Sequence, residues 1–216
     1  KEYQQTASAQ IIRQHLRDSG YQVNEVILNG RDFGVLENRT RWFLVAATHG
    51  ISVDLEALAP VCTPVRTVSE VLEPVGEDSD AWRDFQYLKT KAVRDAEKGN
   101  GFAMQIVEPS DSSVPVLRKG YHKGGSTDPL LKHPSKEGLY RLFSAVEHAR
   151  IKQIPEHLIA GMSQTKAHEL LGQSVLYAPV RALFKRIGSA LGRWATGHDQ
   201  NTPVVTQPYQ LARATG

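Results

Sequence analysis

The sequence is poor in cysteine. Cys62 is the only one among 216 residues, so an internal disulfide cannot form. A single thiol and scattered histidines also lack the ligand spacing of a metal site, and we expect none. The longest strictly apolar run, Trp42 to Ala47, is far shorter than a membrane span, and no secretory signal opens the chain. We therefore expect a cytoplasmic protein with no membrane partner.

Neither sign of charge dominates the chain. It has 26 Lys and Arg residues against 23 Asp and Glu, a net charge of +3 and a pI of about 9.0, which permits a polyanionic partner without requiring one. A hydrophobic content of 40% and a charged content of 23% are ordinary for a soluble globular protein, which at this length holds one large or two small domains. Residue 1 is Lys and not Met, so we expect part of a longer chain.

The N-terminal part predicts an α/β arrangement. Apolar residues recur at helical spacing between positions 9 and 16, and Gly20 is placed to end that helix. Residues 21–28 and the apolar run 42–47 are typical of strands, the second covered on both faces. Two strands and one helix do not make a stable domain, so this part needs further strands.

Two capping boxes predict helix starts further along the chain. Thr67 with Glu70 predicts a short helix, and Ser144 with Glu147 predicts a helix that begins at Ala145.

Apolar spacing predicts three more elements. These are a helix over 82–96, a strand over 102–107, and a last helix with Pro179 in its first turn. The apolar stripe of that last helix is formed by Val180, Leu183, Phe184, Ile187 and Leu191.

Two arginines, Arg39 and Arg41, stand just before the apolar run. Along an extended backbone, residues two apart point to the same side, so a rigid strand would hold both guanidiniums where a phosphate or a polar base edge can bind. The alternative is two solvated arginines at a strand entrance, which spacing alone favours.

A basic segment spans residues 117–136. It holds five cationic residues against one acid, Asp128, so its net charge is +4. Its glycines let the backbone approach a surface closely, and an aromatic side chain is interleaved, as contact with a phosphate backbone requires. A mobile solvated loop explains the composition equally well. The candidate DNA-binding residues are Arg118, Lys119, Tyr121, Lys123 and Lys132.

The stretch from Asp32 to Arg41 resembles the eighth conserved motif of the DNA cytosine-5 methyltransferases. That motif runs Asp, aromatic, Gly, hydrophobic, Pro, Gln, any residue, Arg, any residue, Arg. Leu36 stands where the family usually has Pro, and Glu37 where it usually has Gln. The acid adds a negative charge beside the arginines, and we expect it to weaken phosphate contact.

Two further motifs follow in family order. The tenth is matched by Gly172, Ser174 and Val175, with Gln173 in place of the usual Asn. The ninth is matched by Arg141, Phe143, Ser144, Glu147, Ala149, Arg150 and Pro155.

The resemblance covers about residues 1–194 and implies an α/β fold. The chain would be the C-terminal part of a Rossmann-like methyltransferase catalytic domain with an inserted mixed α+β target-recognition domain. The implied divisions are the end of the catalytic domain in 1–58, target recognition with the ninth motif in 59–158, a return to the catalytic domain in 159–196, and a disordered tail in 197–216.

The resemblance also implies roles for individual residues. Arg41 aligns with the arginine that helps hold the target cytosine, and Arg39 with the one that braces the catalytic glutamate. Gln173, Ser174 and Val175 align with residues that line the S-adenosylmethionine pocket. The insert that reads double-stranded DNA in the family contains the basic segment, so charge and family order indicate the same region.

Three parts of the family's chemistry are missing from this sequence: the Pro-Cys-Gln motif whose cysteine attacks a flipped cytosine, the Glu-Asn-Val motif, and the glycine-rich turn that binds the cofactor. In family order they precede Lys1, so we expect S-adenosylmethionine to be bound mainly by a missing N-terminal half. Cys62 follows the eighth motif without a basic neighbour, and we do not expect it to be the nucleophile.

Two alternatives stay open. The first is a DNA-binding-only module from a split or decayed methyltransferase, and the second is an unrelated α/β protein whose basic segment binds RNA or another acidic partner. Pro-Cys-Gln and Glu-Asn-Val in the upstream coding sequence would favour the enzyme over the first. The second requires three ordered motif matches to arise by chance.

Overall fold

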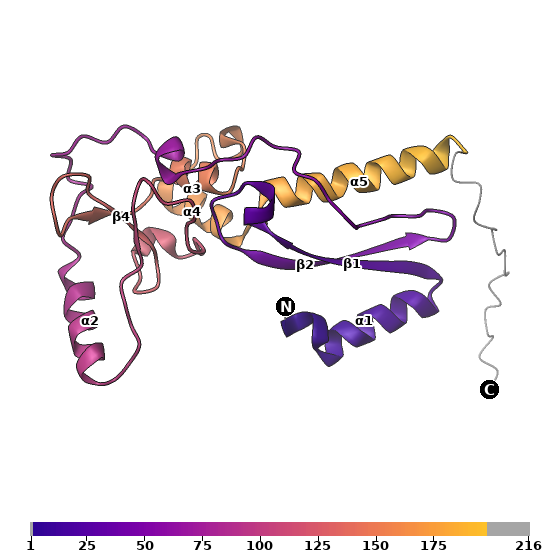
Figure 1. Ribbon diagram of the computed structural model, residues 1–216, viewed down its shortest axis with the longest axis horizontal. Coiled ribbons are helices and arrows are strands. Elements are labelled where there is room, and N and C mark those ends of the chain that lie inside the picture. The colour runs from indigo at the N-terminus through magenta and orange to yellow at the C-terminus, as the bar shows by residue number, and fades with distance from the viewer. Residues whose placement is uncertain (1, 198–216) are drawn as a thin grey trace. The chain divides into compact units, whose positions relative to one another are not determined.

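The computed structural model describes residues 2–197 (Figure 1). Contacts within the chain divide it into two compact units, which are described separately. Among the described residues, the first unit comprises 2–27, 42–58 and 183–197, and the second comprises 28–41 and 59–182. Three elements have residues in both units, namely β1 (Tyr21–Asn29), β2 (Thr40–Thr48) and α5 (Tyr177–Ala195).

The first unit begins with a short 3-10 helix, η1 (Glu2–Gln5), and α1 (Ala7–Asp18). The Thr6 hydroxyl accepts a hydrogen bond from Ala9 N and so caps α1, and the chain turns at Gly20 with φ +85°. Strands β1 and β2 then pair in a two-stranded sheet. The predicted helix and both strands are confirmed.

Strand β2 of the first unit is less buried than its apolar run predicted. No residue of β2 is fully buried, so the expectation that this strand is covered on both faces is wrong for the described residues. In a two-stranded sheet β2 has one hydrogen-bonded neighbour, and each strand is an edge. Ile11 and Ile12 of α1 are 68% and 42% exposed. The buried core residues are Val53, Leu55, Leu183 and Ala190.

The second unit is built on a three-stranded sheet of β3 (Ile106–Val107), β4 (Leu130–Lys132) and β5 (Tyr140–Arg141). β3 and β4 are parallel, whereas β4 and β5 are antiparallel. Helices α3 (Ala145–Ile151) and α4 (Gln164–Gln173) pack on each other through alanines and leucine (Figure 1). The second unit also contains four described 3-10 helices, η2 (Gly30–Phe33), η3 (Val68–Val71), η4 (Tyr121–Lys123) and η5 (Glu156–Leu158).

Both capping boxes are confirmed. Glu70 accepts a hydrogen bond from Thr67 N at 3.0 Å before η3, and Glu147 accepts one from Ser144 N at 2.8 Å before α3. These local signals succeed because each needs only residues three apart.

Two predicted boundaries are wrong. The helix expected over 82–96 is α2 (Gln86–Glu97), which begins later because Phe85 has a left-handed backbone with φ +48° and Asp84 accepts a hydrogen bond from Gln86 N. Of the strand expected over 102–107, only Ile106 and Val107 pair with β4.

The last helix, α5, carries Pro179 in its first turn as predicted. Its apolar stripe is only partly buried: Leu183 is 4% exposed, whereas Phe184 is 65% and Leu191 45% exposed. The predicted tail lies outside the described residues except for Gly197. The compact units share a boundary near residue 58 with the predicted functional domains but place 159–182 with the second unit, so the functional division stays a prediction.

Candidate functional site

Residues 29–41, which we call the arginine loop, run from the end of β1 to the first two residues of β2 and have a hydrogen-bonded backbone. Gly30 N donates to Arg39 O at 3.1 Å and closes the loop. Gly34 has φ +74°, and a Cβ at this position would lie 2.6 Å from Pro64. Glycine is therefore required both for the turn and for the close approach of the chain at Pro64.

The acid of the arginine loop, Glu37, is fully buried between two cations. Its Oε2 lies 3.1 Å from Lys152 Nζ, and its Oε1 lies 3.5 Å from Arg39 Nη1. Lys152, which follows α3, is equally inaccessible. Burial raises the pKa of Glu37 and lowers that of Lys152, while attraction between the two opposes both shifts. The charge of Glu37 is thus balanced by Lys152 and Arg39 inside the protein, and the carboxylate does not face a bound phosphate. The expectation that Glu37 weakens phosphate contact is therefore corrected.

The two arginines of this loop have different surroundings. Arg39 is 9% exposed, and its Nε has no acceptor among the described residues. Arg41 is exposed, and its Nη1 donates to Thr40 O at 2.8 Å. Burial lowers the pKa of Arg41 and the charge of Arg39 lowers it further, with a partial offset from Glu37. The loop therefore holds one inward guanidinium and one accessible guanidinium, a difference that spacing did not predict.

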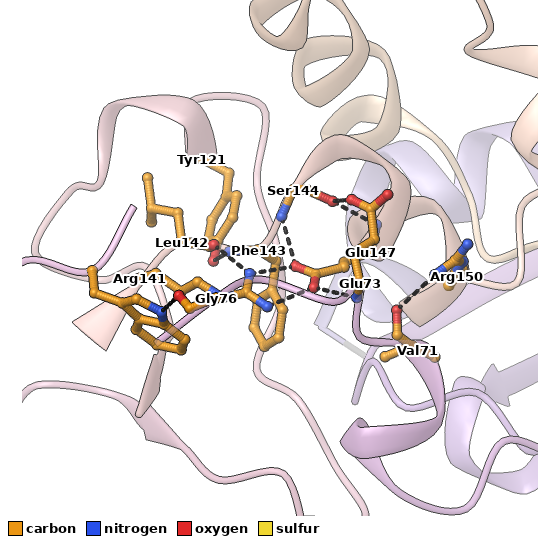
Figure 2. Close-up of polar contacts among 11 residues, drawn as sticks. Val71, Glu73, Gly76, Tyr121, Arg141, Leu142, Phe143, Ser144, Glu147 and Arg150 are labelled. Atoms are coloured by element: carbon orange, nitrogen blue, oxygen red, sulfur yellow. Dashed lines mark hydrogen bonds and ion pairs between the residues drawn. The ribbon is translucent and has the colours of Figure 1, made fainter. Parts of the chain in front are cut away.

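Three ninth-motif residues, Arg141, Ser144 and Glu147, meet in a cluster around a buried ion pair (Figure 2). Arg141 donates to Glu147 through two nitrogens at 2.7 and 2.6 Å, and the two side chains are 4% and 0% exposed. Glu147 also accepts hydrogen bonds from Ser144 N and Glu73 N, each at 2.8 Å. The cluster joins β5, the start of α3 and the segment after η3, so its role is to hold the second unit together.

Part of the basic segment is exposed and fixed in place. Arg118, Lys119 and Lys123 are exposed, and Arg118 Nη2 lies 3.4 Å from Asp128 Oδ1. A Cβ at Gly172 of α4 would lie 2.2 Å from Lys119 N, so the backbone here packs directly on α4. That contact argues against a mobile solvated loop at this point.

Two other predicted DNA-binding residues have partners in the protein. Lys132 forms an ion pair with Glu108 at 2.6 Å. Tyr121 is fully buried; its hydroxyl donates to Pro129 O at 2.8 Å and accepts from Phe143 N at 2.9 Å. Its predicted contact with DNA is therefore corrected, because the side chain belongs to the core of the second unit.

The predicted cofactor segment connects α4 to α5. Ser174 N donates to Leu170 O at 2.9 Å and its hydroxyl donates to Leu171 O at 2.6 Å, so both polar groups serve to end α4. Gln173 and Val175 are exposed. One exposed amide and one exposed apolar side chain do not form a complete pocket, so the cofactor role of this segment stays a prediction.

Cys62 is a half-buried free thiol. Arg181 Nη1 lies 3.7 Å from its sulfur, so the expectation that no basic group adjoins it is wrong; the neighbour comes from a distant part of the sequence. Within residues 2–197, no three His, Cys, Asp or Glu side chains group as metal ligands. Over the same range, no helix has both the length and the apolar character needed to cross a membrane.

Sequence reasoning missed the burial of several polar residues, among them His148, His168 and Lys152. His148 and His168 approach through their Nδ1 atoms at 3.0 Å, and burial is the main cause that lowers their pKa values to about 2 and about 4. Lys152 is the residue directly after α3, four positions after the buried His148, so it continues the buried side of that helix. Helical spacing after the capping box was the signal that would have placed Lys152 inside.

The family model described as C-5 cytosine-specific DNA methylase matches residues 2–189. Type II methyltransferase M.NlaX of Neisseria lactamica is 29% identical over 84% of this chain and 57% of its own length. Type II methyltransferase M1.ScrFI of Lactococcus lactis subsp. cremoris is 28% identical over 80% of this chain and 44% of its own length. The chain thus spans about half the length of these relatives.

Solved structures share the fold. The Dnmt2 methyltransferase of S. pombe is 21% identical, with a TM-score of 0.72 over 88% of this chain and 66% of its own. The Entamoeba histolytica methyltransferase EhMeth is 19% identical, with a TM-score of 0.66 over 88% of this chain and 60% of its own. The predicted α/β methyltransferase fold is confirmed.

Proposed function

This chain belongs to the C-5 cytosine-specific DNA methylase family, and on that premise we propose that it is the C-terminal part of a DNA (cytosine-5-)-methyltransferase. It binds duplex DNA, recognises a target sequence and helps hold the flipped cytosine for methyl transfer from S-adenosylmethionine. Residues 59–158 act as the target-recognition domain, and 1–58 with 159–196 complete the catalytic domain.

The observation that carries the proposal is the unequal pair in the arginine loop. Buried donors are normally paired, yet Arg39 Nε has no acceptor among the described residues. A carboxylate from an upstream part of the protein would satisfy it. Arg41 is exposed two residues away, where its guanidinium can donate to the polar edge of a flipped cytosine. Fixed donors there stabilise the charge that develops when the ring is attacked.

The cofactor, when bound, supplies an electrophilic methyl group. In this chain Gln173 and Val175 contact part of it, and an upstream half provides most of the pocket. Arg118, Lys119 and Lys123 neutralise backbone phosphates, because they are exposed cations on a backbone that packs against α4.

Exposed apolar side chains in the first unit support an upstream partner segment. Ile11 is 68%, Phe184 65% and Trp194 52% exposed. Single exposed apolar side chains are ordinary, but Phe184 and Leu191 lie seven residues apart and share one side of α5, and grouped apolar side chains mark a surface that another part of a protein covers. We assign that cover to an N-terminal catalytic half carrying the nucleophile, the glutamate and the cofactor turn.

The experiment is transfer of a labelled methyl group from S-adenosylmethionine to duplex DNA by the whole encoded protein, followed by bisulfite sequencing. Methylation of cytosine within one short sequence is expected. If the whole protein binds one duplex sequence tightly and transfers no methyl group, the DNA-binding-only module is correct. If it shows no preference for duplex DNA, both functions are wrong.

A further inference from the structure

Four charged side chains lie close together at this site, and Glu37 is the only acid among Glu37, Arg39, Arg41 and Lys152. Lys152 and Arg39 both lie near the carboxylate of Glu37, and the charges of Arg39 and Arg41 each lower the pKa of Lys152. A buried carboxylate between two cations fixes where each cation sits, because an unpaired buried charge is costly. Glu37 therefore sets the position of Arg39, and Lys152 is the charge that lets Glu37 be buried.

Lys152 also stands where three segments of the second unit meet. Its backbone carbonyl accepts a hydrogen bond from Tyr177 N, the first residue of α5, at 3.4 Å. The side-chain amide of the next residue, Gln153, donates through Nε2 to Gly34 O at 2.8 Å and to Thr63 O at 3.1 Å. The end of α3 thus holds both the arginine loop and the beginning of α5.

We propose that Glu37 and Lys152 act as one positioning pair, which holds Arg39 and through it Arg41 in the geometry that methyl transfer requires. The proposal rests on the proposed function. Glu37 occupies the position where the family usually has Gln, and the structure shows why an acid works here: the buried ammonium of Lys152 balances it.

The positioning pair and the family resemblance predict opposite effects of Glu37→Gln: the resemblance predicts that activity is kept, whereas the pair predicts that it is lost. Glu37→Gln restores the usual family residue, yet here it leaves Lys152 and Arg39 facing each other without a counter-charge. Lys152→Gln leaves Glu37 with Arg39 alone. The double variant Glu37→Gln with Lys152→Gln has two neutral amides, which can hydrogen-bond to each other.

The test uses the whole protein and measures methyl transfer to duplex DNA below the melting temperature of every variant. Each single variant should lower kcat by about tenfold or more while the Kd for DNA changes less than about threefold, and the double variant should recover most of the loss. Glu156→Gln is the matched control, since it removes an exposed acid from the ion pair with Arg150. It should leave kcat unchanged.

A second readout does not depend on activity. The Nε–Hε signals of Arg39 and Arg41 in NMR spectra should shift in each single variant and return in the double variant. Singles that unfold more easily but keep wild-type kcat and unshifted arginine signals would make the pair merely structural and overturn the proposal. A double variant as impaired as the worse single would do the same. If the wild-type protein is inactive, the enzyme assignment fails, and the NMR result alone decides whether the pair positions the arginines.

Discussion

Arg141 and Glu147 form a two-point ion pair, at 2.7 and 2.6 Å, with almost no solvent access to either side chain. In addition, Glu147 accepts backbone hydrogen bonds that begin α3 and fix Glu73 (Figure 2). The ninth motif in this chain thus has a structural role: its ion pair and hydrogen bonds hold β5, α3 and the segment at Glu73 together. Resemblance identified these residues, and the structure supplies the physical reason for them.

Removing one partner of this pair should destabilise the protein strongly. Arg141→Met leaves a buried carboxylate without its counter-charge, and we expect a loss of about 3–5 kcal/mol in the free energy of unfolding. Asp78→Asn, which removes the exposed partner of Lys136, should leave the free energy of unfolding almost unchanged, because solvent screens an exposed ion pair. Urea denaturation of both variants checks the difference; equal losses would contradict a structural role for Arg141.

The basic segment should control the salt dependence of DNA binding. Replacing Arg118, Lys119 and Lys123 by glutamine should weaken duplex binding and reduce the slope of log Kd against log salt by about 2–3, because each phosphate contact releases a counterion. The matched control replaces Arg17, Lys98 and Lys166, which are exposed and lie elsewhere in the sequence. An equal change in the control would mean that only net charge matters.

Tyr121 should behave as a core residue. Tyr121→Phe removes a hydroxyl that makes two buried hydrogen bonds and leaves Pro129 O and Phe143 N unpaired. We expect a loss of about 1–3 kcal/mol in unfolding free energy with an unchanged salt slope for DNA binding. Full stability together with weaker DNA binding would restore the original sequence-based role of this residue.

The buried histidine pair should make stability depend on pH. In the contact between His148 and His168 one Nδ1 donates and the other accepts, and burial favours the neutral form of both rings in the folded state. Their folded pKa values, about 2 and about 4, lie below the ordinary 6.5, so the unfolded chain binds more protons below that pH. Stability is therefore full above about pH 6.5 and falls as the pH decreases toward 4.

Unfolding free energies at pH 8, 6.5 and 5 measure this dependence. The variant His168→Gln, which removes one of the titrating rings, should show a smaller decrease over the same range. A wild-type stability that is constant from pH 8 to pH 5 would contradict neutral buried histidines.

The sequence predicted the elements whose signals are local. Capping by Ser144 and Glu147, the stop at Gly20 and Pro179 in the first turn of α5 each involve residues close in sequence, and all three are confirmed. Of the strand expected over 102–107, only two residues form β3, because the length of a strand depends on where its partner, β4, lies, and β4 is distant in sequence.

The candidate site was predictable in its residues and not in its environment. Spacing and resemblance found Arg39 and Arg41, but the difference in their burial comes from residues far along the chain. Lys152 is more than a hundred positions from Glu37, and no local pattern pairs them. Tyr121 was wrongly predicted to bind DNA because it stands among basic residues in the sequence, as surface aromatic residues do. Its burial comes from packing against Phe143 and α3, which lie further along the chain.

Arg41 should act on catalysis more than on binding. In the whole protein, Arg41→Ala should reduce methyl transfer by about a hundredfold or more, while duplex binding falls less than about tenfold, because the guanidinium holds the flipped base and not the duplex. Single-turnover transfer and fluorescence anisotropy measure the two quantities. Equal losses in both would make Arg41 a phosphate contact.

Complementation between two separately produced parts tests the central claim most directly. Labelled methyl transfer from S-adenosylmethionine to duplex DNA is measured for this chain alone, for the upstream part alone, and for the two mixed. We predict no transfer by either part and transfer to cytosine by the mixture, since this chain holds the arginines and the basic segment while the upstream part holds the nucleophile and most of the cofactor pocket. Transfer by this chain alone, or a stable but inactive complex with an upstream part that carries the cysteine and glutamate motifs, would contradict it.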